Sequence, residues 1–265
     1  LDHFAGPGIK VTPEVKGKDA DIRVETWTNA EGDVKVTLLD AEGNVVAEGN
    51  GTDTTLKVAD VHLWDGVADP YLYTVEAKLT VDGKAVDKVQ TTCGVRYYKF
   101  DPDKGFFLNG RPYNLHGVSR HQDFKGIGNA IKKEHHDKDM ELIREIGANT
   151  IRLAHYQHDQ YFYDLCDKYG MVVWAEIPYI SEHLANGDAN TESQMKELII
   201  QNYNHPCIVM WGLSNEITIS GRSKKKQMLE NHRRLQKMVK EMDSTRTTTL
   251  ACYAVALHWE PSAHI

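Results

Sequence analysis

The sequence predicts a small antiparallel β-sandwich followed by an incomplete (β/α)8 barrel of about five β/α units. Residues 9–98 alternate apolar and polar side chains with a period of two, which is typical of half-buried strands. After Gly94, short apolar strands alternate with amphipathic helices, and this order predicts a parallel sheet that helices cover on both faces. Polar residues end several of these strands, which favours a barrel over a doubly wound sheet.

The sandwich prediction depends on strands at 21–29 and 75–81 and on turn signals at 42–44 and 82–83. This part holds a single cysteine, Cys93, which excludes a disulfide between its two sheets. The four cysteines of the chain are widely spaced and form no CxxC pair, so they are expected to be buried free thiols.

The barrel prediction rests on five strands with helices between them. The strands are expected at 113–118, 149–156, 171–177, 207–215 and 247–253. The helices are expected around 140–146, 161–170, 191–203 and 223–242, the third of them opened by a capping box of Thr191 and Gln194. The predicted domains are the end of a linker at 1–8, the sandwich at 9–98 and the barrel part at 99–265.

The length of the chain and the absence of nucleotide-binding motifs limit the possible architectures. No GxGxxG or GxxxxGK[ST] motif follows the early strands, so the main sign of a nucleotide-binding sheet is lacking. The stretch from Gly105 to Ile265 is too short for eight strands, because a full barrel takes roughly 200 to 250 residues. The last strands of a barrel are therefore expected to be missing, and the open sheet edges would favour association of two copies.

Composition and charge exclude several classes of partner. The formal net charge of −7 and the lack of a basic stripe argue against a nucleic-acid partner. No apolar stretch approaches the roughly 18 residues of a membrane span, and the start of the chain lacks the pattern of a signal segment. We therefore expect neither a nucleic acid nor a membrane as partner.

The sharpest candidate for chemistry is Glu216, which follows Asn215 at the end of the apolar stretch IVMWGLSN. Apolar surroundings disfavour the ionised form of a carboxyl, which suits a general acid that works near neutral pH. Asn215 can donate to a substrate hydroxyl while its amide oxygen is held from behind. The structural alternative is that the pair caps the helix beginning near Ser223, but polar residues on neighbouring strand ends favour the chemical interpretation.

Arg152 and His155 lie at the end of the second barrel strand, in RLAHY. Because side chains alternate along a strand, at most one of them points straight into the barrel unless the strand has already ended. The alternative for His155 is a hydrogen-bonded histidine without a chemical role. Glu176 in WAEIP gives the rim a second carboxylate, the minimum for cleaving a glycosidic bond, but we do not expect it to be the nucleophile.

The stretch HGVSRHQD gathers four polar residues: His116, Arg120, His121 and Asp123. Metal sites place ligands at spacings such as HxxxH or CxxC, which this stretch does not match, and His158 opens a helix whose face belongs to the core. We therefore expect no metal. Cationic and neutral donors suit sugar recognition better. An apolar platform for a sugar ring has three candidates, with core packing as the alternative for the first two: Trp174, Trp211 and Trp259.

Several ordered motifs together resemble glycoside hydrolase family 2, and most of all its bacterial β-galactosidases. They are LWDGVADPYLYTV, GFFLNGRPYNLHGVSRHQD, IGANTIRLAHY, LCDKYGMVVWAEIP, NHPCIVMWGLSNE and DSTRTTTLACY, and they cover almost the whole chain. The resemblance implies an immunoglobulin-like sandwich followed by the first part of a catalytic TIM barrel. The compartment stays undecided between the bacterial cytoplasm and the periplasm.

The resemblance also implies roles for single residues. In the family, the glutamate of the Asn-Glu pair is the general acid/base, which implies that role for Glu216, with Asn215 reaching the sugar 2-hydroxyl. It further implies that the galactose subsite is lined by His121, Arg152 and His155. The nucleophile is implied on a seventh strand that this chain does not reach, so the chain alone is expected to be inactive. Some relatives bind magnesium through a carboxylate where this chain has Ile180, so no cofactor is expected.

The leading hypothesis is thus part of a retaining exo-glycosidase that hydrolyses terminal β-D-galactosides of oligosaccharides or glycoconjugates and assembles as a homo-oligomer. A β-glucuronidase or β-mannosidase of the same family is the first alternative. A metal-dependent barrel hydrolase and a non-catalytic carbohydrate-binding protein stay open as different classes.

Overall fold

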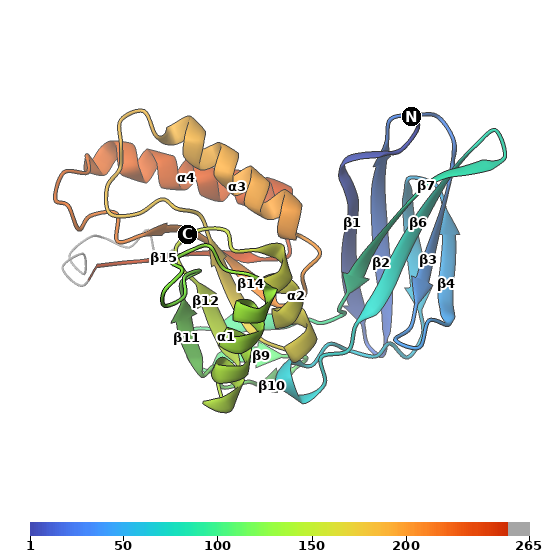
Figure 1. Ribbon diagram of the computed structural model, residues 1–265, viewed down its shortest axis with the longest axis horizontal. Helices are drawn as coiled ribbons and strands as arrows, with labels where there is room; N and C mark the ends of the chain where they lie inside the picture. The colour runs from blue at the N-terminus through green and yellow to red at the C-terminus, as the bar shows by residue number, and fades with distance from the viewer. Residues whose placement is uncertain (254–265) are drawn as a thin grey trace. The chain divides into compact units, whose positions relative to one another are not determined.

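The computed structural model describes residues 1–253, and the chain divides into two compact units (Figure 1). The first unit holds residues 1–115 together with 166–171 and 203–207. The second holds 116–165, 172–202 and the described residues from 208 onward.

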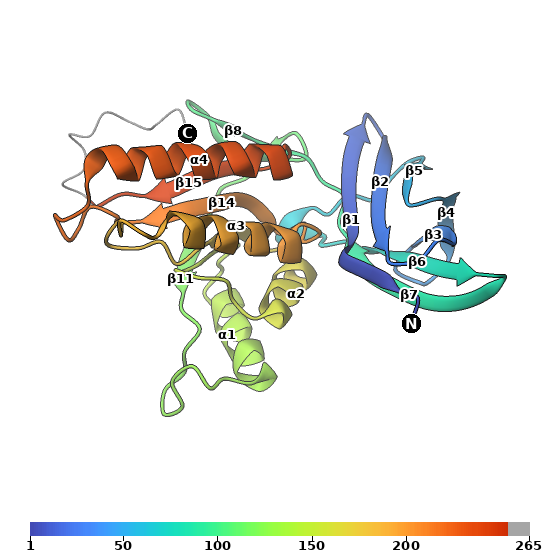
Figure 2. The ribbon, with the colours of Figure 1, turned by 90° about the horizontal axis from the view of Figure 1, so that it is seen from above.

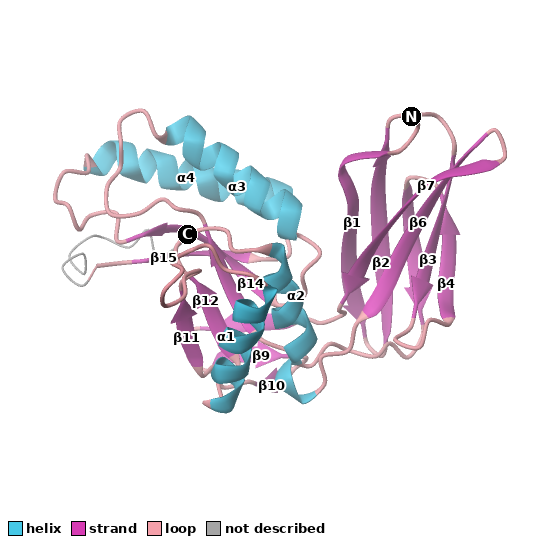
Figure 3. Ribbon diagram, viewed as in Figure 1, coloured by secondary structure: helices cyan, strands magenta, loops and turns pink. Residues whose placement is uncertain are grey.

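The first unit contains an antiparallel immunoglobulin-like sandwich of two sheets, drawn as magenta arrows in Figure 3. One sheet has the order β1-β2-β5, with β1 at Phe4–Lys16, β2 at Asp19–Thr28 and β5 at Asp53–Val58. The other has the order β4-β3-β6-β7, with β3 at Asp33–Leu39, β4 at Val45–Asn50, β6 at Tyr73–Val81 and β7 at Lys84–Cys93. A 3-10 turn, η1, spans Gly66–Ala68.

Alternating apolar residues of both sheets form the core of the sandwich, as their period of two predicts. Ile22 and Val24 of β2 and Val75 and Leu79 of β6 are all fully buried. The strand β1 begins at Phe4, inside the segment 1–8 that we predicted to be linker. Phe4 is buried and pairs with Thr28, so its apolar side chain ties the start of the chain to the sandwich.

A small antiparallel sheet that we did not predict follows the sandwich, in the order β10-β9-β8. Its strands are β8 at Tyr98–Asp101, β9 at Gly105–Leu108 and β10 at Arg111–Pro112. Asn109 and Gly110 both have positive φ, at 50° and 79°, as a two-residue Asn-Gly hairpin requires. Each strand is too short to show a periodic pattern in the sequence.

The second unit is part of a TIM barrel, with five parallel strands in the order β11-β12-β13-β14-β15 and helices α3 and α4 side by side (Figure 1, Figure 2). The strands are β11 at Gly117–Arg120, β12 at Thr150–Leu153, β13 at Val172–Glu176, β14 at Ile208–Asn215 and β15 at Thr247–Ala251. The helices are α1 at Lys133–Glu145, α2 at Gln160–Tyr169, α3 at Asp188–Asn202 and α4 at Lys225–Met242. This confirms the predicted alternation, and no helix of the described residues is long and apolar enough to cross a membrane.

Several predicted boundaries were wrong, among them the start of the first barrel strand and the start of helix α3. The first barrel strand begins at Gly117 and not at 113, because the Tyr113 N–H donates instead to the Phe106 carbonyl of β9. Helix α3 begins at Asp188, so Thr191 lies inside its first turn, where the hydroxyl donates to the Asp188 carbonyl at 2.9 Å. Thr191 therefore does not open a capping box.

The register of the parallel strands brings four residues close together. Glu176 of β13 pairs with Gly212 of β14, and Trp174 pairs with Arg152 of β12. A Cβ at Gly212 would lie 2.4 Å from Trp174 Nε1 and 2.5 Å from Glu176 Cβ, closer than real side chains approach. Glycine at this position therefore leaves the room that Trp174 and Glu176 occupy.

Candidate active site

The centre of the site is the Glu176 carboxylate at the end of β13. Its Oε1 accepts hydrogen bonds from Arg152 Nη2 at 3.0 Å and faces His155 Nδ1 at 2.7 Å. Its Oε2 accepts from Arg152 Nε at 3.0 Å, which completes a two-pronged ion pair. The Glu176 side chain is only 1% exposed, so the carboxylate is buried and both of its oxygens are occupied.

This geometry argues against a nucleophilic role for Glu176. A nucleophile must present a free carboxylate oxygen to the reacting carbon, whereas both oxygens of Glu176 hold Arg152 and His155. Arg152 also stacks on the Trp174 ring, with the guanidinium carbon 4.5 Å from the ring centroid. Glu176 therefore orients the neighbouring cation and histidine. One signal of this contact was present in the sequence, since Arg152 and Glu176 lie near the ends of consecutive predicted strands.

Asn215, the last residue of β14, is held on three sides. Its side-chain Oδ1 accepts a hydrogen bond from Arg152 Nη2 at 2.7 Å. Its backbone N–H donates to the Tyr179 carbonyl, and its carbonyl accepts from the Ser181 N–H. The amide oxygen is thus held from behind, as expected. The amide nitrogen then remains available to donate a hydrogen bond to a ligand.

Glu216 comes directly after the strand, and its side chain is half-buried instead of enclosed. Its φ of 47° is unusual for a residue with a side chain. The backbone N–H donates to the Ala251 carbonyl at 2.9 Å, and the Glu216 carbonyl accepts from the Ile219 N–H at 2.9 Å. Within residues 1–253 the carboxyl has no hydrogen-bond or ion-pair partner, unlike Glu176, so it is the carboxyl of this pair that can meet a ligand.

His155 and His121 complete the arrangement. Strand β12 ends at Leu153, so strict alternation no longer applies, and both Arg152 and His155 reach Glu176. His121 follows the last residue of β11, and its ring meets that of His155 edge to face with centroids 5.0 Å apart. The structure therefore brings together the predicted residues His121, Arg152, His155 and Asn215 at the carboxyl ends of the strands.

Other residues of the predicted rim lie elsewhere. His116 precedes β11 and is exposed, as is Asp123, while Arg120 is buried against α1 and α2. The prediction that the four polar residues of HGVSRHQD lie together is therefore wrong, because the strand is four residues long and its side chains alternate between two faces.

Of the tryptophans predicted to form an apolar platform, the two that the structure describes do not lie together. Trp211 is fully buried and donates from Nε1 to Asp243 at 2.8 Å, which makes it a core residue. Trp174 lies in the interior beside Arg152, and its Nε1 has no hydrogen-bond partner within residues 1–253. Trp259 lies outside the described residues.

One group of potential metal ligands lies in the first unit. Ligand atoms of Asp167, His205 and Cys207 are all within 4.8 Å of one another. Asp167 Oδ2, however, lies 2.6 Å from His205 Nδ1, and Asp167 Oδ1 accepts from the Cys207 backbone N–H at 3.1 Å. These distances are those of a hydrogen-bonded ion pair, which is satisfied without a metal ion.

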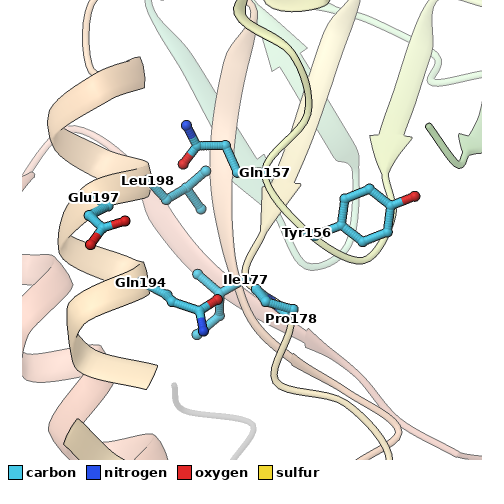
Figure 4. Close-up of a pocket in the computed structure, with 7 residues that line it drawn as sticks. All are labelled: Tyr156, Gln157, Ile177, Pro178, Gln194, Glu197 and Leu198. Carbon is cyan, nitrogen blue, oxygen red and sulfur yellow. The ribbon is translucent and has the colours of Figure 1, made fainter. Parts of the chain in front are cut away.

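A separate pocket of about 290 Å³ lies between α3 and the loops after β12 and β13 (Figure 4). Its lining is mixed, with apolar Ile177, Pro178 and Leu198 beside the polar ends of Gln157, Gln194 and Glu197. The ring of Tyr156, which also borders it, points away from α3 in Figure 4. Neither Arg152 nor His155, which hold the Glu176 carboxylate, lines this pocket, so the pocket and the predicted site have different linings.

Buried histidines make the stability of the fold depend on pH. Burial lowers the pKa of His158 to about 3 and that of His232 to about 4, from 6.5. Below pH 6.5 the unfolded chain therefore takes up protons that the folded chain does not. The free energy of unfolding should fall as the pH decreases below 6.5, by up to about 1.4 kcal/mol per pH unit for each histidine. Above pH 6.5 the two histidines should make their full contribution to stability.

Urea unfolding at about pH 7.5 and about pH 5 measures this dependence. The variant His232→Asn should show a smaller loss between the two values, because asparagine does not titrate. A stability that is equal at both pH values in the wild-type protein would show that the histidines are not held neutral.

Two family models match the chain. "Glycosyl hydrolases family 2" matches residues 5–96, and "Glycosyl hydrolases family 2, TIM barrel domain" matches residues 102–257. A β-glucuronidase from Bacteroides fragilis is 39% identical over 273 residues, which is 94% of this chain and 39% of that protein. A β-galactosidase from Thermoanaerobacter pseudethanolicus is 38% identical over 149 residues, which is 54% of this chain and 20% of that protein.

Among solved structures, the chain is similar to an FMN-binding β-glucuronidase from Facaelibacterium prausnitzii, with a TM-score of 0.91 and 43% identity. The match covers 95% of this chain and 41% of that one. These two relatives each match nearly all of this chain, which spans about two fifths of their length.

Proposed function

The chain belongs to glycosyl hydrolases family 2, and from this premise we propose that the full-length protein is a retaining exo-glycosidase with Glu216 as its general acid/base. The observation that carries the proposal is the contrast between the two rim glutamates. Glu176 is buried and paired, while the Glu216 carboxyl has no partner within residues 1–253 and follows Asn215 directly. A general acid/base must reach the glycosidic oxygen and exchange its proton, which only the second can do.

The chemistry follows from these roles. Glu216 donates its proton to the oxygen of the leaving group while a carboxylate outside the described residues attacks the anomeric carbon. Glu216 then takes a proton from water, which cleaves the covalent intermediate. Asn215, oriented by Arg152, donates to a sugar hydroxyl, and His155 and His121 line the same side of the subsite. No step of this reaction requires a metal or a cofactor.

We favour a terminal β-D-glucuronide over the β-D-galactoside that the sequence motifs led us to expect. Most of the relatives that match nearly the whole chain are named β-glucuronidases. A putative β-galactosidase from Bacteroides fragilis also covers 94% of the chain, at 36% identity, and another β-galactosidase relative matches about half of it. The galactoside expectation rested on RHQD and RLAHY. In the structure Arg152 of the second motif is committed to Glu176 and Asn215, so it does not distinguish one sugar from another.

Hydrolysis of matched 4-nitrophenyl glycosides by the full-length protein tests both parts. We expect kcat/KM for the β-D-glucuronide to exceed that for the β-D-galactoside and β-D-mannoside by about tenfold or more. A higher value for the galactoside would overturn the choice of sugar. If the protein hydrolysed none of the three glycosides, the proposal that it is a glycosidase would be overturned. Loss of activity with a chelator would favour a metal-dependent hydrolase instead.

A further inference from the structure

The residues on both sides of His155 are held by one buried ring, that of His158. Its Nε2 lies 3.0 Å from the Ala154 carbonyl oxygen, and its ring stacks on Tyr156 with centroids 5.1 Å apart and an interplanar angle of 23°. His158 is 2% exposed. The segment that carries His155 is therefore fixed at both of its neighbours to a side chain that water does not reach.

Arg120 fixes His158 in turn. Its Nη1 lies 3.0 Å from His158 Nδ1, and since a guanidinium only donates, Nδ1 must be the acceptor. The ring proton is then on Nε2, where it is donated to the Ala154 carbonyl. Arg120 is itself immobilised by Asp139, whose carboxylate accepts from Nε at 2.9 Å, and by the Phe162 ring 3.8 Å from its guanidinium carbon.

The group formed by Arg120, His158 and residues 154–156 is also connected to the carboxyl ends of the strands. The Ala154 N–H donates to the Arg120 carbonyl at 3.0 Å, which joins the end of β12 to that of β11. The Tyr156 hydroxyl accepts from the Gln122 N–H at 2.9 Å and lies 3.5 Å from His121 Nδ1. A displacement of His158 would therefore be transmitted to the backbone on each side of His155.

We propose that His158 is a positioning residue: clamped by Arg120, it sets the place of the His155 ring against Glu176 and so shapes the sugar subsite. The effect on catalysis rests on the proposed function, in which His155 contacts the sugar. His158 itself touches no substrate, because it is buried on the helix side of the sheet with Arg120 and Phe162.

A double-mutant cycle in the full-length protein tests the proposal, with KM and kcat measured on 4-nitrophenyl β-D-glucuronide. His158→Leu should raise KM by roughly tenfold and change kcat less, because a shifted His155 weakens sugar binding. His158→Gln, which keeps a donor and an acceptor, should restore most of the loss. In a His155→Ala background, His158→Leu should have little further effect on KM.

His136→Leu is the matched control. His136 is also buried and accepts from Arg120, with Nη2 and Nδ1 3.0 Å apart, but within residues 1–253 no hydrogen bond or ring contact joins its side chain to residues 154–156. Its replacement should lower the unfolding temperature and leave KM close to that of the wild-type protein. Equal rises of KM for His136→Leu and His158→Leu, or additive effects in the His155→Ala background, would overturn the positioning role.

A crystal structure of His158→Leu separates this inference from the proposed function. The His155 ring should move away from the Glu176 carboxylate, and an unmoved ring would overturn the proposal whatever the kinetics show. If His155→Ala leaves KM unaltered, the role of His155 in sugar binding is what fails, and the position of the ring alone then decides the matter.

Discussion

Replacing Glu216 by glutamine in the full-length protein is expected to lower kcat/KM for glycosides with poor leaving groups by about 10² to 10⁴. Glutamine keeps the size of the side chain but has no proton to give to the departing oxygen. Aryl glycosides whose leaving groups depart without protonation should keep a fast first step and show slow release of the sugar. Steady-state and pre-steady-state rates on the two kinds of substrate measure this difference.

Glu182→Gln is the control for this experiment. Glu182 lies in the loop after β13 and pairs with the exposed Arg222, so its charge is removed close to the rim without touching the site. Its kinetics should be those of the wild-type protein. Unaltered turnover of unactivated glycosides by Glu216→Gln would show that the proton comes from another group.

Replacing Glu176 by leucine is expected to destabilise the barrel by about 3–5 kcal/mol, because removal of one partner of a buried ion pair leaves the other charge without compensation. Arg152 would lose the two hydrogen bonds that it donates to this carboxylate, and its side chain is only 20% exposed. His155 would lose its partner as well. The free energy of unfolding in urea measures the loss.

The matched variant Glu182→Leu removes a carboxylate from an exposed pair, since the Arg222 side chain is 74% exposed. Such a pair contributes at most about 1 kcal/mol, so the loss should be small. If both replacements cost the same free energy, then the Glu176 cluster does not behave as a buried ion pair and the account of its geometry is wrong.

The regular parts of the fold could be predicted because their patterns are local. The alternation at 75–81 corresponds to β6, and the continuous apolar stretch 207–215 corresponds to β14 with an error of one residue. The first barrel strand could not be placed correctly, because the backbone of Tyr113 pairs with Phe106 in a small sheet whose strands are too short to show a period.

The site could be predicted in residue types but not in contacts. Placement at strand ends pointed to Arg152, His155 and Asn215, because parallel strands end at one edge of a sheet. That one carboxylate, Glu176, would hold both Arg152 and His155 depends on the register between β12 and β13, which the sequence does not show. The burial of Arg120 beside two helices is likewise a tertiary contact without a local pattern.

The role of Glu216 as the acid/base of the site is tested most directly by adding azide to the variant Glu216→Ala with an activated aryl glycoside. Azide attacks the covalent sugar intermediate without help from a base, so it should replace the step that the variant has lost. We expect faster release of the aryl group and a glycosyl azide that keeps the configuration of the substrate. Rates that azide leaves unchanged, with water as the only acceptor, would contradict it.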